Sequence, residues 1–215
     1  MYRHRLGRGS MTDRYKASGS QTEFQPGSDD RVLRNVLGIT SPEEMDEIEL
    51  LLLEQLYREV LGPDFPAGKL SVADLKDWHY RWLGNVYPWA GEERSVNLAK
   101  GDFHFAAATQ IPRLLEEFER NCLERFTPCD ILSESELVAA IAVTHVELIL
   151  IHPFREGNAR LARLLADVMA TQAGHGLLDY SDWDSEKASY FAAIQQGMAG
   201  DYGPMKRLAA AALTG

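Results

Sequence analysis

The residues of this chain that best fit a chemical role lie within one short stretch. Residues 152–163 read HPFREGNARLAR, which combines a histidine, a glutamate, a Gly-Asn pair and two arginines. The stretch is polar and runs directly into the periodic apolar segment LARLLADVMATQAG, so it predicts a turn that opens a helix capped by Asn158. Both arginines would then lie near the positive end of the helix dipole, which repels cations.

A bound polyanion would account for those arginines. A Gly-rich turn at a helix N-terminus directs backbone N–H groups toward one point, and phosphates accept paired hydrogen bonds from Arg160 and Arg163. Glu156 would repel phosphates unless a divalent cation lay between them, and Mg²⁺ is usually held by one or two carboxylates plus phosphate oxygens. His152, with an ordinary pKa of about 6.5, is the candidate proton acceptor.

Each of these residues also has an ordinary structural explanation when taken alone. His152 fits a satisfied histidine at a helix end, Glu156 a charge that complements the dipole, and the arginines solvated side chains. One alternative is a metal-hydrolase site made of His145, Glu147 and His152, although the spacing HxExxxxH differs from HExxH. Another is a helical binding module without chemistry, against which the intact His152 and Glu156 argue.

The elements around this turn are predicted to be helices. Capping boxes mark three helix starts: Ser41 with Glu44, Ser71 with Asp74, and Ser133 with Glu136. The first helix should run for about five turns. The third is apolar on almost every side, which is typical of a buried central helix, and it leads into His152. Further helical spacing is found in TQIPRLLEEFERNCLERF, SEKASYFAAIQQGM and GPMKRLAAAAL.

The only convincing β signal lies in SVNLAKGDFHFA. Val96 and Leu98, then Phe103 and Phe105, alternate on either side of KGD, which predicts a short hairpin. The fold class is therefore mainly α. Residues 31–215 are expected to form one domain behind a polar arm of residues 1–30, in which residues 1–10 are set aside as a cloning remnant or an alternative start.

Composition excludes several functions. The net charge of −10 argues against nucleic acid as a partner, because phosphate contacts need clustered cations. The longest uncharged apolar runs, such as VAAIAV, are far too short to span a membrane, so no membrane partner is expected. Cys122 and Cys129 form no disulfide framework, which favours a cytoplasmic location.

The stretch HPFREGNARLAR resembles the active-site motif of the Fic family, HxFx(D/E)GNxRxxR. NVYPWAGEERSVNLAKGDFHF is similar to the segment before and through the family's target-docking hairpin, or flap, and PGSDDRVLRNVLGI to the approach to its first helix. The resemblance covers roughly Phe24 to the C-terminus. It implies a Fic-type helical bundle with a short β-hairpin flap.

The resemblance implies a protein adenylyltransferase, which transfers AMP from ATP to a Ser, Thr or Tyr hydroxyl of a target protein and releases pyrophosphate. His152 would deprotonate the hydroxyl and Glu156 would hold Mg²⁺. The other implied site residues are Gly157, Asn158 and Ala159 as the anion hole, Arg160 and Arg163 on the leaving phosphates, Tyr190 near the adenine, and Lys100 and Gly101 in the flap. A Fic-fold phosphotransferase and a catalytically silent Fic-fold binding module stay open as alternatives.

Many Fic proteins carry an inhibitory helix with the pattern (S/T)xxxE(G/N), which this chain lacks. The nearest spacing, Thr40 to Glu44, is followed by Met45. Restraint is therefore expected from a separate antitoxin protein, from oligomerisation, or from nothing. This favours a bacterial toxin or effector, acting in the cytoplasm of its own cell or translocated into a host cell.

Overall fold

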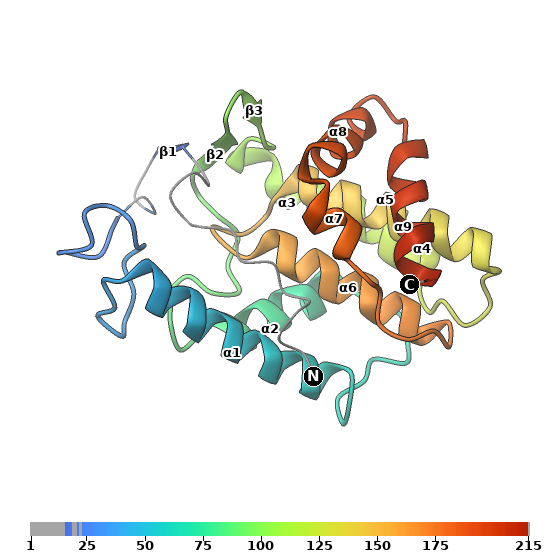
Figure 1. Ribbon diagram of the computed structural model, residues 1–215, viewed down its shortest axis with the longest axis horizontal. Coiled ribbons are helices and arrows are strands. Elements are labelled where there is room, and N and C mark those ends of the chain that lie inside the picture. Colours follow the sequence, from blue (N-terminus) through green and yellow to red (C-terminus); the bar gives the residue numbers. More distant parts are fainter. Residues whose placement is uncertain (1–15, 19–20, 22, 215) are drawn as a thin grey trace.

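The computed structural model of the chain describes residues 16–18, 21 and 23–214, and helices make up most of it (Figure 1). The helices are α1 (Pro42–Val60), α2 (Val72–Leu83), α3 (Ile111–Phe118), α4 (Glu124–Phe126), α5 (Glu134–Ile151), α6 (Asn158–Gln172), α7 (Ser181–Ser185), α8 (Lys187–Gly197) and α9 (Gly203–Thr214). The strands are β1 (Lys16–Ser18), β2 (Asn97–Lys100) and β3 (Phe103–His104). A 3₁₀ turn, Ala108–Gln110, precedes α3, and a π-helical turn, Glu119–Leu123, joins α3 to α4. The predicted mainly α fold is confirmed.

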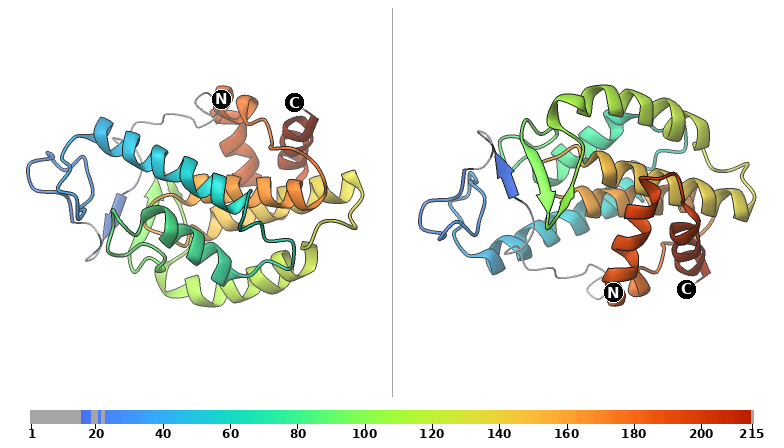
Figure 2. Two further views of the ribbon diagram at one scale, coloured as in Figure 1. Left: turned by 90° about the horizontal axis from the view of Figure 1, so that it is seen from below. Right: turned by 90° about the horizontal axis from the view of Figure 1, so that it is seen from above.

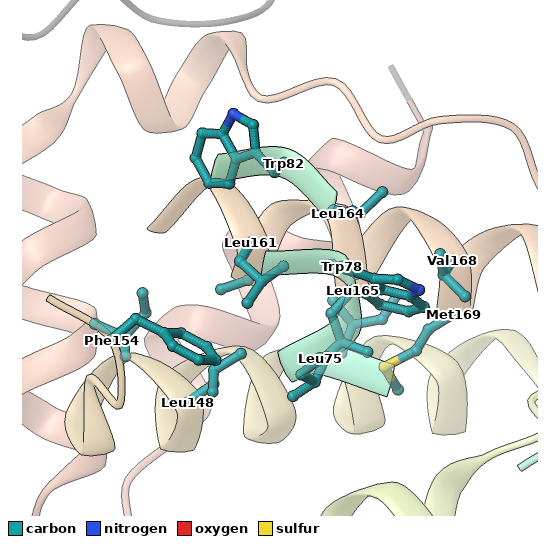
Figure 3. Close-up of a cluster of buried hydrophobic side chains, with 14 of the residues drawn as sticks. Leu75, Trp78, Trp82, Leu148, Phe154, Leu161, Leu164, Leu165, Val168 and Met169 are labelled. Carbon is teal, nitrogen blue, oxygen red and sulfur yellow. The ribbon is translucent and has the colours of Figure 1, made fainter. Parts of the chain in front are cut away.

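Helices α5 and α6 pack against each other in the middle of the molecule. Figures 1 and 2 show α1 and α2 on one side of this pair and α7, α8 and α9 on the other. The apolar sequence of α5 explains its place, because α3, α6, α8 and α9 all contact it. Close-packed side chains from α2, α5 and α6 fill the core, among them Trp82, Leu148, Leu161 and Leu165 (Figure 3).

The predicted helix starts are found where the capping boxes stand. At α2 and α5 the box is complete, with serine and acidic side chain each bonded to the other's backbone. At α1 only half of it forms: Ser41 Oγ accepts from the Glu44 amide at 3.3 Å, but its own proton goes to Glu43 at 2.8 Å. Helix α1 runs for 19 residues, which agrees with the predicted length of about five turns.

The predicted hairpin also forms, with Ala99 opposite His104 and Lys100 opposite Phe103. Gly101 makes the tight turn at φ 58°, a conformation that glycine adopts without steric cost. The sequence carried no convincing β signal outside this hairpin, yet β1 pairs with β2 and gives a sheet of order β1-β2-β3. Pairing with an open strand edge, which local pattern does not reveal, orders this part of the polar arm. Residues 1–10 lie outside the described part of the chain.

Two short helical elements differ from the predicted helices. Helix α7 was not predicted, and the π-helical turn interrupts a segment that was predicted to be helical throughout; both are short and depend on neighbouring elements. Within the described residues, no helix is both long enough and apolar enough to cross a bilayer.

Candidate active site

The motif stretch forms a tight turn between α5 and α6. Helix α5 ends at Ile151, and the residue that caps it, His152, adopts a left-handed conformation with φ 51°. Helix α6 begins after Gly157, whose φ is 81°, so the prediction that Asn158 caps this helix was wrong by one residue. The Asn158 side chain instead binds both backbone groups of Phe154, accepting from its N–H at 2.9 Å and donating to its carbonyl at 2.8 Å. Asn158 therefore fixes the shape of the turn.

Glycine is required at position 157 for two reasons. A side chain there would be strained by the positive φ, and a Cβ would lie 2.6 Å from the indole of Trp82. The close approach lets the turn pack onto α2. The amides that follow, at the start of α6, have no partners inside the helix, which leaves them able to bind an anion.

His152 is held in one orientation and kept neutral. Its Nδ1 lies 3.2 Å from the Ile149 carbonyl, so the proton belongs on Nδ1 and Nε2 is the basic nitrogen. The imidazole stacks on Phe105 of the flap segment at 3.8 Å between ring centroids. Burial lowers the pKa of His152 to about 3, and the neutral ring is the form that can accept a proton.

Glu156 lies near the end of the same turn, directly before Gly157. It is only 5% exposed, and its Oε1 accepts from the Gly157 amide at 3.0 Å. Its backbone carbonyl lies 3.1 Å from Nε2 of His79, whose Nδ1 accepts from the Gly91 amide at 2.8 Å. His79 also stacks on Phe154 at 4.0 Å. No motif in the sequence singles out His79, yet this side chain positions the turn that carries Glu156.

The donor set around Glu156 fits Mg²⁺ better than a metal held by protein alone. Among the described residues, no three His, Cys, Asp or Glu side chains gather as a metal site. A single carboxylate beside an anion-binding turn matches the coordination of Mg²⁺ by one or two carboxylates, phosphate oxygens and water.

The rival metal-hydrolase arrangement is not assembled. His145 Nε2 lies 2.8 Å from the Tyr190 hydroxyl, while Glu147 accepts from the Tyr202 hydroxyl at 2.6 Å. The two side chains thus contact different neighbours, and His152 is bonded to its own helix.

Arg160 turns toward α1 and α2. Its Nη2 donates to Glu49 at 2.6 Å and lies 3.4 Å from Glu156, and its guanidinium lies 4.6 Å from the Trp82 ring. Glu49 is fully buried and also accepts from the Tyr87 hydroxyl at 2.7 Å. One signal could have revealed Glu49: it is the single charge on the buried stripe of α1, between Met45 and Leu53.

Arg163 turns the other way, toward α7. It makes two hydrogen bonds to Asp184, at 2.7 Å and 3.3 Å, and its guanidinium lies 4.8 Å from the Tyr180 ring. Both arginines of the motif are therefore paired with carboxylates from elsewhere in the chain. Neither pairing follows from local spacing.

A cavity of about 220 Å³ lies between the flap and α8. It brings together four of the predicted residues, namely Lys100, His152, Ala159 and Tyr190. Lys100 Nζ lies 4.0 Å from the centre of the Phe191 ring, so the flap contacts α8 through two residues that both line the cavity. Glu156, Gly157, Asn158, Arg160 and Arg163 are not among the residues that line it.

Arg94 joins the flap to the turn and was missed by the sequence reading. Its guanidinium donates to four carbonyls: Ile151 and His152 at the end of α5, Val96 before β2, and Ala106 after β3. Its backbone amide donates to Pro153 at 2.7 Å. Burial lowers its pKa to about 10, so the group is still charged at neutral pH. A cation at the C-terminal end of α5 is favoured by the helix dipole.

Comparison with known proteins agrees with this geometry. The sequence pattern of the Fic/DOC family matches residues 69–170. The "Probable protein adenylyltransferase y4lH" of Sinorhizobium fredii is 30% identical over 184 residues, which is 84% of this chain and 89% of that protein. The chain belongs to the Fic/DOC family.

Two further Fic proteins show how far the similarity extends. The protein adenylyltransferase VbhT of Bartonella schoenbuchensis is 31% identical over 71% of this chain, which spans only 31% of VbhT. The N-terminal Fic domain of a VirB-translocated Bep effector protein from Bartonella quintana, solved with bound ADP, superposes with a TM-score of 0.70 at 26% identity, covering 88% of this chain and 92% of that one. The predicted Fic-type bundle with a hairpin flap is confirmed.

Proposed function

We propose that this Fic protein is a protein adenylyltransferase that moves AMP from ATP to a Ser, Thr or Tyr hydroxyl of a target protein. The observation that supports this most is the shared cavity of His152 and Ala159, which stand at opposite ends of the motif turn. A general base and a helix N-terminus beside one cavity suit attack on a phosphate. Relatives at about 30% identity bear the same activity in their names, and a Fic neighbour contains bound ADP.

The proposed reaction needs positioning and charge neutralisation more than covalent chemistry. The target oxygen forms a bond to the α-phosphorus while the bond from that phosphorus to the α–β bridging oxygen breaks. The hydroxyl proton passes to Nε2 of His152, and the electron pair of the broken bond leaves with pyrophosphate. The Ile149 carbonyl, on Nδ1, stabilises the imidazolium that results. Amides at the start of α6 and the guanidinium of Arg163 would bind the phosphates.

Glu156 would hold Mg²⁺, which supplies charge neutralisation on the phosphates when bound. Its carboxylate already has one fixed donor, the Gly157 amide, which orients Oε1. Lys100 and Gly101, near the flap turn, would align an extended target segment beside His152 by strand addition. Tyr190, 8% exposed at the cavity, would contact the adenine.

Two isotopic labels test the assignment. The purified chain is incubated with a bacterial or host-cell lysate and ATP labelled on either the α- or the γ-phosphate. We expect the label on the α-phosphate to appear in a protein band and the label on the γ-phosphate not to appear. The His152→Ala variant is the negative control. The opposite pattern would establish the phosphotransferase alternative, and no label from either would favour the silent binding module.

We extend the proposal to a toxin or effector type, held in check by a separate antitoxin protein. It is supported by the missing inhibitory pattern and by the effector role in the name of the Bartonella quintana neighbour. Expression of the chain alone should slow growth of a bacterial host, and the His152→Ala variant should not. Equal growth of the two strains at equal protein levels would contradict this part of the proposal.

A further inference from the structure

The carboxylate of Asp184 occupies the face of Arg163 that a phosphate would use. The two groups meet side by side, with Nη2 on Oδ1 at 2.7 Å and Nη1 on Oδ2 at 3.3 Å. Guanidinium groups bind phosphates through the same fork of paired N–H donors. A carboxylate and a terminal phosphate are both anions, so they cannot share that fork without repulsion.

The pair is able to open. The side chain of Asp184 is 29% exposed, and it belongs to the five-residue helix α7 at the surface. Water can therefore solvate the carboxylate once Arg163 leaves it, so that opening this partly buried pair does not leave the charge of Asp184 without water. Arg163 would keep other contacts, because its guanidinium also lies 4.8 Å from the Tyr180 ring and 6.0 Å from that of Trp183.

Arg163 is the more exchangeable of the two motif arginines. Arg160 is bonded to Glu49, a fully buried carboxylate that a nucleotide could displace only by leaving a charge without water. The terminal phosphates of a nucleotide would therefore meet Asp184 as their competitor. The strength of that competition depends on how many phosphates the nucleotide carries.

We infer that Asp184 is a specificity-determining residue, which competes with the terminal phosphate of a bound nucleotide for Arg163. It thereby reduces the preference of the site for a nucleoside triphosphate over shorter nucleotides. The inference rests on the proposed function, since it takes the motif turn as the phosphate site.

The test measures nucleotide affinity by titration calorimetry on the whole chain with Mg²⁺. The ligands are the α,β-methylene analogues of ATP and ADP, which resist cleavage at the reacting bond, and AMP. In Asp184→Asn we expect the affinity for the ATP analogue to rise by about threefold to tenfold, because the charge that competes with the terminal phosphate for Arg163 is removed. The ADP analogue should gain less, and AMP should bind as to the parent.

Asp182→Asn is the matched control, because it removes the same charge from an exposed residue of the same helix. It should leave all three affinities unchanged. Unchanged or weaker binding of the ATP analogue to a folded Asp184→Asn protein would overturn the inference, and so would an equal gain for AMP. Should the asparagine variant fail to fold, Asp184→Ser decides by the same criteria. A parent chain that binds none of the nucleotides would refute the proposed function instead.

Discussion

The turn between α5 and α6 has two sides that are built differently. The anchoring side faces α1 and α2 and consists of Glu49, His79, Trp82, Tyr87 and Arg160. The cavity side faces the flap, α7 and α8: His152, Ala159 and Tyr190 line the cavity, and the pair of Arg163 and Asp184 belongs to the same side without lining it. Both sides hold an arginine paired with a carboxylate, but Glu49 is 0% exposed and Asp184 is 29% exposed.

This difference separates a fixed pair from an exchangeable one. A buried carboxylate that loses its partner has no water to replace it, so Glu49 and Arg160 hold each other in place. A carboxylate that water can partly reach loses less when its partner binds something else. The anchoring side should therefore control stability, and the cavity side should control ligand binding and catalysis.

Glu49→Ala should have the largest effect on stability. It removes the partner of Arg160 and of the Tyr87 hydroxyl, and breaking such a buried pair costs about 3–5 kcal/mol. Urea unfolding followed by circular dichroism measures the loss. Asp184→Ala is the matched comparison on the cavity side and should cost less than about 1 kcal/mol. Equal losses in the two variants would remove the distinction between the two sides.

In contrast to Glu49→Ala, His152→Ala should affect catalysis much more than stability. Loss of the proposed base should lower AMP transfer by about 10²–10⁴-fold. Affinity for ATP should change little, since the base acts on the target hydroxyl. Transfer is measured with α-labelled ATP, affinity by calorimetry and folding by the melting temperature. Transfer at the parent's rate would reject the role of His152.

Glu156→Gln tests the proposed role of Glu156 in holding Mg²⁺. Glutamine retains an oxygen that can accept from the Gly157 amide but lacks the charge that Mg²⁺ requires. We expect the affinity for ATP with Mg²⁺ to fall to the value measured with a chelator, while the affinity without metal rises or stays equal. A variant that keeps its full response to Mg²⁺ would reduce Glu156 to a charge at the helix start.

The buried side chain of His145 should make the fold sensitive to acid. Burial lowers its pKa to about 3, whereas an unfolded histidine has a pKa of about 6.5. Between these values the unfolded chain binds the extra proton, so stability falls as the pH drops below 6.5. At pH 5 this proton uptake by the unfolded chain lowers the free energy of unfolding by about 2 kcal/mol. Urea midpoints at pH 7.5 and 5.0 should differ less in His145→Gln, and an unchanged difference would contradict the assignment.

Ala159→Gly should have the smallest effect. Alanine suits the first turn of a helix, and its methyl group lines the cavity without adding charge. We expect a transfer rate equal to the parent's or higher by about threefold at most, with α-label still the one transferred, because glycine only removes the methyl. A switch to γ-label would show that the methyl group sets the orientation of the nucleotide.

Local patterns in the sequence predicted most of the fold. Capping boxes, helical spacing and the alternation around KGD involve residues a few positions apart, so they are readable along the chain. The motif stretch was readable for the same reason, and its turn forms between α5 and α6. Strand β1 could not be predicted in this way, because its pairing partner lies about 80 residues away and its own three residues carry no pattern.

The partners of the site residues were the part that could not be predicted. Glu49 is 111 residues from Arg160, and Asp184 is 21 residues from Arg163, beyond the reach of helical spacing. In the sequence Asp184 resembles an ordinary surface charge, and only its place among the apolar residues of α1 sets Glu49 apart. Their roles depend on which helix faces come together, which packing decides.

The bonds of Arg94 also decide which parts of the molecule open together. One side chain holds the carbonyls at the end of α5 and those at both ends of the flap. Movement of Arg94 would therefore release the base of the flap and the backbone of His152 together. In hydrogen exchange, amides at these ends should exchange in one cooperative event. Those at the tip around Gly101 lie beyond the bonds of Arg94, and they should exchange sooner through a smaller opening.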